Sequence, residues 1–396
     1  MKLIYEIGVR VFYCFMYVAS FIDSKAKAWI QGTNIKVETT DEPCIWIHSA
    51  SLGEYNQAES LVSLLEKSGY KFVFTFFSPS GFEKVKTDYP KYYLRLDTQR
   101  NAKEFIARIN PSLAIFVKSE YWFNHLSVLE ANNIPLVFLN SLLHKDHYFF
   151  KWYGKWSLSK IRSTKFFYTN DKNTSELLNS NGILQNLNLG DTKVDQVIKA
   201  KQNKQELLKI TTNRKIILGA SLEYGDREVS KLLLENYSEE FLLIIVPHEP
   251  SESTFDYYSG LSQHKLVKYS ELSNTDAKVI YVDEFGILPA LFQYAWVSYV
   301  GGGFDKGIHN ILESCVESKP MIFGPKHHKF PEAQELINAK AAISINHPEE
   351  ISDAIAYFED QTNFDHAASA CKEYIASHKG ATQKIYDHMT QNFLNK

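Results

Sequence analysis

Short apolar runs alternate with segments of helical periodicity from residue 44 to about residue 345. In the first half, six apolar runs have the length and composition of buried strands, and each is followed by a plausible helix. This alternation predicts a parallel sheet with helices on both faces. The predicted strands are 44–48, 71–77, 92–96, 113–117, 135–139 and 166–169.

The alternation pauses over the polar, Lys-rich stretch 188–213 and then restarts with strands predicted at 215–220, 241–246, 278–282, 297–300 and 320–323. The sequence therefore predicts an α/β protein built from two doubly wound, Rossmann-like domains that face a cleft. In such domains ligands bind at the carboxyl ends of the strands. We expect one domain over 26–200, a second over 201–375, and a final helix over 376–396 that packs back on the first domain.

The N-terminal region has its own pattern, because residues 11–22 (VFYCFMYVASFI) are almost continuously apolar or aromatic. This run is shorter than the roughly 20 residues that a spanning helix needs. Glu6 weakens the basic region expected of a signal peptide. We interpret residues 1–25 as an amphipathic or shallowly inserted membrane-associated helix. The alternatives are a buried helix of the first domain, a single span and a signal peptide.

Composition excludes some classes of protein. Hydrophobic residues make up 44% and charged residues 22%, which is ordinary for a globular protein. The net charge of −3 argues against a nucleic-acid-binding protein held by bulk charge. The four cysteines show no C-x-x-C spacing, and the pairs His144/His147 and His327/His328 lack the H-E-x-x-H pattern. We therefore expect no disulfide framework, no metal and no cofactor.

The segment 48–54 (HSASLGE) directly follows the first predicted strand. Its small residues, Ser51 and Gly53 among them, would let the backbone turn tightly into a helix. Glu54 would then point into the cleft as a general base. Alternatively, it only complements the helix dipole. Glu120, which follows the strand at 113–117, is a second candidate of the same kind.

A glycine-rich segment, 301–310 (GGGFDKGIHN), follows the strand at 297–300. Four glycines in seven residues allow close approach to a phosphate, and a following helix would add free N–H groups. Glu313 shares a helix face with Asn310 and could accept hydrogen bonds from ribose hydroxyls. The alternative is a turn that serves packing only. Ser221 and the Pro247–His248 pair follow other strands of this domain and would line the same cleft.

Taken together, these motifs resemble the bacterial 3-deoxy-D-manno-octulosonic acid (Kdo) transferases of lipopolysaccharide assembly. Besides the N-terminal anchor, the matching segments, in the family's order, are HSASLGE (48–54), FSPSGFEK (77–84), SEYWFN (119–124), GDTKVD (190–195), GAS (219–221), VPHEP (246–250), DEFGIL (283–288), GGGFDKGIHNILE (301–313) and FGPKHHKFPEA (323–333).

The resemblance implies an inverting glycosyltransferase of the GT-B fold, with an N-terminal acceptor domain and a C-terminal donor domain. It implies CMP-Kdo as donor, a lipid A precursor (lipid IVA) as acceptor, and attachment to the cytoplasmic face of the inner membrane. It also implies that Glu54 is the catalytic base. We expect acceptor contacts or transition-state support from Ser51, Gly53 and Glu120. We expect donor contacts from Lys193, Ser221, Pro247, His248, Gly302, Gly303, Gly307, His309, Asn310 and Glu313.

The chain departs from the family pattern in three places. Many members have an acidic residue at the position of Lys118 and an arginine near Leu142, and many read P-R-H-P where this chain has 247–250 (PHEP). These departures bear on donor-phosphate and acceptor contacts. Two other functions stay open: a GT-B enzyme or epimerase that uses a UDP-sugar, and a membrane-attached sugar-nucleotide-binding protein without catalysis.

Overall fold

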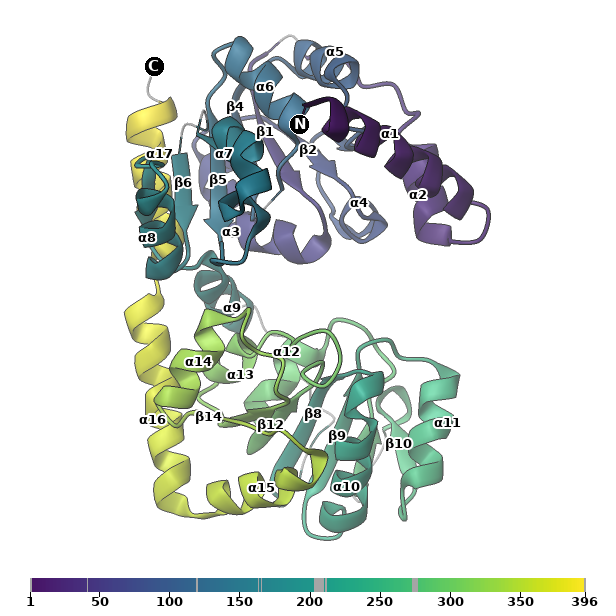
Figure 1. Cartoon of the computed structure of the whole chain (residues 1–396). Helices are drawn as coiled ribbons and strands as arrows, with labels where there is room; N and C mark the ends of the chain where they lie inside the picture. Colours follow the sequence, from purple (N-terminus) through teal and green to yellow (C-terminus); the bar gives the residue numbers. More distant parts are fainter. Residues whose placement is uncertain are drawn as a thin grey trace. The chain divides into compact units, whose positions relative to one another are not determined.

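The structure, a computed structural model, describes residues 2–40, 42–118, 120–162, 164, 166–202, 210, 212–272 and 277–394. The chain forms two compact units: Met1–Gln196 with Gly380–Lys396, and Val197–Lys379 (Figure 1). Each unit contains one seven-stranded sheet. The prediction of two doubly wound α/β units is confirmed. The expected polar linker 188–213 lies partly outside the described residues, as does Ser119 of the SEYWFN segment.

The sheet of the first unit has the order β3-β2-β1-β4-β5-β6-β7, with all neighbours parallel. The strand order reverses at β1, so the carboxyl ends of β1 and β4 form the switch point where such sheets bind ligands. The strands are β1 Cys44–Ser49, β2 Phe72–Phe76, β3 Lys91–Tyr93, β4 Pro111–Val117, β5 Leu136–Ser141, β6 Phe166–Thr169 and β7 Asn186–Asn188.

The central strand β1 is buried over its whole length, which is why its sequence is continuously apolar. Trp46 packs into a cluster on one face of the sheet, whereas Ile45 and Ile47 pack into a second cluster on the opposite face. The helices that begin in this unit are α1 Lys2–Ala19, α2 Ser24–Gly32, α3 Leu52–Lys67, α4 Pro79–Lys84, α5 Gln99–Ile109, α6 Phe123–Ala131, α7 Lys155–Ile161, α8 Lys172–Ser180, α9 Thr192–Gln202 and α17 Ala381–Met389.

The second unit repeats this plan with the strand order β10-β11-β9-β8-β12-β13-β14. Its switch point lies between β8 and β12. The strands are β8 Ile216–Leu222, β9 Leu242–Pro247, β10 Leu266–Lys268, β11 Val279–Tyr281, β12 Val297–Val300, β13 Met321–Phe323 and β14 Ala342–Ser344. The helices are α10 Arg227–Tyr237, α11 Glu252–Leu261, α12 Leu288–Leu291, α13 Leu312–Val316, α14 Pro331–Asn338, α15 Ile351–Glu359 and α16 Gln361–His378.

The helix α17 belongs to the first unit although it follows the second in the chain. Ile385 and Met389 are fully buried in the same apolar cluster as residues of α3. The Tyr386 hydroxyl lies 2.6 Å from the Ser68 hydroxyl at the end of α3. Asp195 of α9 accepts hydrogen bonds from the backbone N–H groups of Gly380 (2.6 Å) and Thr382 (2.7 Å), so that it caps α17.

The helix α1 contacts the first unit at its start, through Tyr5, and again farther along, where Phe12 packs against Trp29 and Phe77. None of its residues is buried, which does not fit the alternative of a buried core helix. Tyr5 donates a hydrogen bond to the buried carboxylate of Asp97 and packs edge-on against Phe123. Among the described residues no single helix is long and apolar enough to cross a membrane. The pair α1 and α2, bent by 119° between them, has enough length and apolar composition only when the two helices are taken together.

We predict that Asp195→Ala loosens α17, because two backbone N–H groups at the helix start lose their acceptor. Loss of such a cap costs about 1–2 kcal/mol, or roughly tenfold faster amide exchange. Hydrogen exchange of the α17 amides measures the effect. Asp387→Ala, on the exposed face of the same helix, is the control and should change exchange little. Equal protection of α17 in the wild type and in Asp195→Ala would contradict the capping role.

Candidate active site

In the first unit, Glu54 lies at the carboxyl end of β1, in the first turn of α3. Its side chain turns back and accepts a hydrogen bond of 2.5 Å from the backbone N–H of Ala50. Ser51 is the N-cap residue but makes no capping bond with its side chain. A Cβ atom at Gly53 would meet nothing nearer than the Ser51 hydroxyl at 4.0 Å. The expectation that Gly53 is needed for a tight turn is therefore wrong, and its missing side chain instead leaves space beside Glu54.

Glu120 follows the neighbouring strand β4, at the same switch point. Its carboxylate accepts a hydrogen bond of 3.0 Å from the Trp122 indole N–H. It lies 3.7 Å from Nε2 of His48, an ion-pair distance. His48 is fully buried at the end of β1, and its Nδ1 lies 2.9 Å from the Thr75 hydroxyl of β2. The sheet thus fixes the position of Glu120 through a buried ring.

The environments of the two carboxylates move their pKa values in opposite directions. Burial raises the pKa of Glu54, and the negative charge of Glu120 raises it further. Burial also acts to raise the pKa of Glu120, but the His48 imidazole and the Trp122 N–H outweigh it, so the pKa of Glu120 is lowered. Divergent pKa values in such a pair commonly separate a proton-transferring group from one that stays ionised. Glu54 therefore has the properties of a general base.

Lys118 comes directly after β4, with a left-handed backbone (φ 61°) that is uncommon for a residue with a side chain. Its backbone N–H donates to the Leu139 carbonyl at 2.7 Å, which holds this conformation. The positive charge of Lys118 acts to lower the pKa of Glu54, against the effects of burial and Glu120. Lys118 thus places a cation beside the predicted base, where many members of the family that the sequence resembles have an acidic residue.

In the second unit the glycine-rich segment packs tightly against other backbone. A Cβ atom at Gly301 would lie 2.4 Å from the Ser221 carbonyl, and one at Gly303 would lie 2.6 Å from the backbone of Gly324. Gly302 and Gly307 have φ values of 87° and 144°. Close packing of the loops after β8, β12 and β13 is therefore enough to explain why glycine is needed at these positions. This agrees with the alternative that the segment is a turn that serves packing only.

A helix follows the glycine-rich segment, as expected, but it is short. The helix α13 begins at Leu312 and has only five residues. The macrodipole depends on aligned peptide units, so this helix offers no strong anion site at its start. The backbone at His309 and Asn310 is not helical. The helix dipole therefore gives little support to phosphate binding here, and the contact of this segment with the donor stays a prediction.

Asn310 and Glu313 lie together as predicted. The Asn310 amide donates a hydrogen bond of 3.1 Å to the carboxylate of Glu313, and its oxygen accepts from the backbone N–H of Leu312 at 3.2 Å. Burial raises the pKa of Glu313 to about 7, although Asn310 acts to lower it. This carboxylate can therefore change its protonation state near neutral pH.

Sequence reasoning missed a buried carboxylate, Asp226, that organises the loops of this unit. It accepts hydrogen bonds from the backbone N–H groups of Glu223 (2.8 Å) and Gly302 (2.7 Å) and from the Tyr299 hydroxyl (2.7 Å). Burial raises the pKa of Asp226 despite these donors. The sequence feature that could have indicated it is the pair of acidic residues, Glu223 and Asp226, just after the GAS segment (219–221).

Glu223, also missed, brings two histidines together. Its Oε1 atom lies 3.2 Å from Nε2 of His309 and 3.9 Å from Nε2 of His248. The two imidazole rings are stacked, with centroids 4.5 Å apart. Burial and His248 lower the pKa of His309, although Glu223 acts to raise it. The three residues follow the adjacent strands β8, β9 and β12 at their carboxyl ends.

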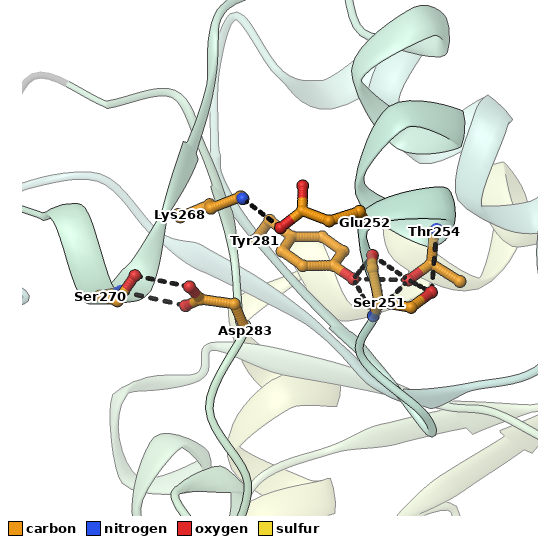
Figure 2. A network of polar contacts seen from close by, with 7 residues as sticks. All are labelled: Ser251, Glu252, Thr254, Lys268, Ser270, Tyr281 and Asp283. Carbon is orange, nitrogen blue, oxygen red and sulfur yellow. Dashed lines mark hydrogen bonds and ion pairs between the residues drawn. The ribbon is translucent and has the colours of Figure 1, made fainter.

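A polar network fixes the segment that carries His248 (Figure 2). At the start of this segment, the His248 N–H donates to the Leu222 carbonyl at 2.9 Å. At its end lies Ser251, the N-cap of α11. The Tyr281 hydroxyl of β11 is bonded to the backbone of Ser251 and to the Thr254 hydroxyl. Figure 2 also shows the Lys268–Glu252 pair at 2.7 Å and Ser270 bonded to Asp283. The loop after β9 is thus held at both ends.

The remaining predicted donor residues lie at separate places. Ser221, within β8, has a left-handed backbone (φ 52°) where the register with β9 shifts. Pro247 is the last residue of β9. Lys193 lies in the first unit, in α9, where its ammonium group is 3.2 Å from the carboxylate of Asp191. The donor roles predicted for these residues stay predictions.

Comparisons with known proteins agree on one family. A family model described as 3-deoxy-D-manno-octulosonic-acid transferase (kdotransferase) matches residues 27–196. The chain is 28% identical over 367 residues to the 3-deoxy-D-manno-octulosonic acid transferase of Rickettsia felis, covering 88% of this chain and 78% of that one. It is 28% identical over 381 residues to that of Haemophilus influenzae, covering 87% and 86%. For Aquifex aeolicus the identity is 27% over 311 residues, covering 75% and 80%.

Solved structures agree on the fold. A UDP-GlcNAc 2-epimerase from Neisseria meningitidis is 14% identical with a TM-score of 0.64, covering 89% of this chain and 100% of that one. MurG from Acinetobacter baumannii is 12% identical with a TM-score of 0.59, covering 88% and 100%. At such low identity these likenesses show the fold alone, and with the two parallel-sheet units they confirm the predicted GT-B fold.

The ordered motifs, the two doubly wound units and these similarities converge. Together they support a bacterial 3-deoxy-D-manno-octulosonic acid transferase, a glycosyltransferase that transfers Kdo in lipopolysaccharide synthesis.

Proposed function

We propose that this protein transfers Kdo from CMP-Kdo to the lipid A precursor lipid IVA, with inversion at the anomeric carbon. The observation that carries the mechanism is the pair Glu54 and Glu120 at the switch point of the first sheet, with pKa values moved apart. A carboxylate with a raised pKa is a stronger base than an ordinary one, which favours transfer of a proton to it. The family resemblance supplies the sugar.

In this mechanism Glu54 takes the proton from a sugar hydroxyl of the acceptor. The hydroxyl oxygen attacks the anomeric carbon of Kdo, and the bond between that carbon and the phosphate oxygen of CMP breaks. CMP leaves on the opposite side with the bonding electron pair, so the configuration inverts in one step. Protonated Glu54 is the immediate product, which its buried environment favours. Ser51 and Gly53, at the start of the same helix, are proposed to flank the acceptor hydroxyl.

The donor is proposed to bind in the second unit. Glu313, oriented by Asn310, accepts hydrogen bonds from the ribose hydroxyls. His309 and His248, with Ser221, Pro247 and the loop of Gly302, Gly303 and Gly307, surround the phosphate and the Kdo carboxylate. The family resemblance also assigns a donor contact to Lys193, which belongs to the first unit. Each of these assignments combines the family resemblance with a position at or beside the carboxyl end of a strand.

A lipid acceptor also explains the surface of α1. Because its side chains are apolar yet unburied, the helix is suited to lie in a membrane interface. We therefore propose that α1 holds the protein on the cytoplasmic face of the inner membrane, beside its acceptor. The large apolar side chains exposed on α1 and the turn after it are Leu3, Ile4, Ile7, Val11, Phe12, Tyr13, Phe15, Tyr17, Val18, Phe21 and Ile22.

The function is tested by incubating the purified protein with CMP-Kdo, generated in place, and tetra-acylated lipid IVA, and by measuring the mass of the lipid. A mass increase of one or more Kdo units is expected, and inhibition by CMP but not by UDP should accompany it. An unchanged lipid with CMP still bound would contradict lipid IVA as acceptor. Failure to bind CMP at all would contradict the donor and favour a different sugar nucleotide.

We predict that Glu54→Gln lowers transfer by at least about 100-fold, because the amide cannot accept the proton. CMP affinity should change little, since Glu54 belongs to the first unit. Lipid mass spectrometry and CMP titration measure the two effects. Glu66→Gln, on the exposed last turn of the same helix, is the matched control and should keep wild-type transfer. Transfer at the wild-type rate by Glu54→Gln would rule out its role as base.

We predict that the rate rises with pH through the raised pKa of Glu54, because only the ionised form accepts a proton. Glu120→Gln removes a like charge, so the pKa of Glu54 falls and the acid limb of the pH–rate profile moves to lower pH. Lys118→Met removes an opposite charge and should move the limb to higher pH. Profiles of kcat for the three proteins test this, and shifts in the same direction for both variants would contradict the electrostatic coupling.

We predict that CMP binding tightens as pH rises through about 7, because the ribose hydroxyls need ionised Glu313 as acceptor. With a pKa near 7, the dissociation constant should fall by about tenfold between pH 6 and pH 8. Calorimetric titration at several pH values measures this. Glu313→Gln should bind more weakly with a flat pH profile over that range, and a wild-type profile in this variant would assign the titration to another group.

A further inference from the structure

A buried carboxylate, Asp97, joins two helices of the first unit. It lies between β3 and α5 and is 2% exposed. Its two oxygens accept four hydrogen bonds from residues that the structure describes, two at each oxygen. The donors are the Tyr5 hydroxyl of α1, the backbone N–H groups of Asn124 (3.0 Å) and His125 (3.1 Å), and Nδ1 of the His125 ring (2.6 Å). These donors offset the cost of burying the charge and fix the carboxylate in one place.

Asp97 caps the start of α6 from outside that helix. The residue at the N-cap position is Trp122, whose side chain makes no capping bond. The N–H groups of the second and third helical residues, Asn124 and His125, are those that an N-cap side chain usually bonds. Here both bond to Asp97, and a negative charge is favourable at a helix start. The N-cap position can therefore hold Trp122, whose indole is left to contact other groups.

Trp122 connects this helix start to Glu120. Its indole N–H donates to the Glu120 carboxylate at 3.0 Å. Its ring packs edge-on against His125, with centroids 6.0 Å apart, and against His48 at 5.5 Å. The His125 ring is itself bonded to Asp97. Asp97 therefore acts on the position of Trp122 in two ways, through the backbone of α6 and through the His125 ring.

Tyr5 brings α1 to the same carboxylate. Its ring packs against Phe123, the first residue of α6, with centroids 5.2 Å apart, and against Trp156 of α7 at 5.7 Å. Burial, and then the charge of Asp97, raise the pKa of the Tyr5 hydroxyl, so it stays protonated and remains a donor. Loss of this hydroxyl would leave a buried carboxylate oxygen with one donor fewer, which is costly for a charged acceptor. The place of α1 and the start of α6 therefore depend on one shared group.

We propose that Asp97 is a positioning residue of the transfer reaction and that Tyr5 couples α1 to it. Asp97 holds the start of α6, α6 holds Trp122, and Trp122 holds the carboxylate of Glu120 at the switch point that also carries Glu54. Asp97 itself does not touch substrate. The role in transfer rests on the proposed function, whereas the chain of contacts from Tyr5 to Glu120 does not.

The geometry is tested without substrate on the full-length protein, with its tryptophan indoles labelled with ¹⁵N for nuclear magnetic resonance. Trp122→Phe identifies the Trp122 signal. Glu120→Gln should move this signal, because its acceptor changes from a carboxylate to an amide. Asp97→Asn should move it as well, because Trp122 loses its support. Asp146→Asn, at a side chain that is 98% exposed, is the matched control and should leave the signal in place.

Tyr5→Phe tests the coupling to α1, because it removes one hydroxyl and keeps the ring. It should move the Trp122 signal in the same direction as Asp97→Asn but by less. Its matched control is Tyr153→Phe, at an exposed tyrosine of the same unit that packs edge-on against Trp152. Should Asp97→Asn fail to fold, as judged by circular dichroism, the signal in Tyr5→Phe decides between the two outcomes.

Kinetics with CMP-Kdo and lipid IVA test the role in the reaction. Asp97→Asn should lower kcat by about 10- to 100-fold, since a small misplacement of a reacting group can cost about 100-fold. The KM for CMP-Kdo should stay at the wild-type value, because Asp97 belongs to the first unit. In a Glu120→Gln background the same change should lower kcat much less, because residues that act through one another are not additive.

Four results would contradict the inference or limit it. An unmoved Trp122 signal in folded Asp97→Asn would overturn it, and a lowered melting temperature with that signal unmoved would make Asp97 a stabilising residue only. Fully additive losses of kcat with Glu120→Gln would refute the route through Glu120. Equal spectra of Tyr5→Phe and Tyr153→Phe would remove α1 from it. If the wild type transfers no Kdo, the proposed function fails, and the Trp122 signal still decides on the contacts.

Discussion

Burial of both faces of each parallel sheet is the constraint on which the rest of the structure depends. Strands such as β1 have no solvated face, so a polar side chain within them costs free energy unless it finds a partner. Chemically active groups are therefore confined to the strand ends. Glu54 and Glu120 in the first unit, and Glu223 and His309 in the second, follow strands that flank a switch point, and His248 follows the next strand, β9.

The same burial gives the first unit its electrostatic character. His48 can stand at the end of β1 only because Thr75 and Glu120 bond or pair with its ring. That pairing keeps Glu120 ionised, and the ionised Glu120 in turn makes ionisation of Glu54 harder. The partners that the buried His48 ring needs therefore also affect the pKa of Glu54, the group that we propose takes a proton from the acceptor.

Much of the fold could be predicted from the sequence, because long apolar runs mark central strands. The strands β7, β10 and β14 were missed. All three lie at the edges of their sheets. Their short length alone is not the reason, because β3, β11 and β13 also have three residues and were predicted. The position of Glu54 followed from its place after a strand. Glu223 and Asp226 were missed because their partners come from other strands, and the start of α13 at Leu312 was not predicted because helical spacing does not reveal where hydrogen bonding begins.

The return of α17 to the first unit has a consequence for synthesis of the protein. Ile385 and Met389 complete an apolar cluster, most of whose other members, from Ile45 to Tyr168, are made more than two hundred residues earlier. Domains commonly fold as they leave the ribosome. Here the first unit cannot bury that cluster until the whole second unit has been translated. Its nascent form therefore exposes apolar surface throughout that interval, and it is the stage at which a chaperone has most to protect.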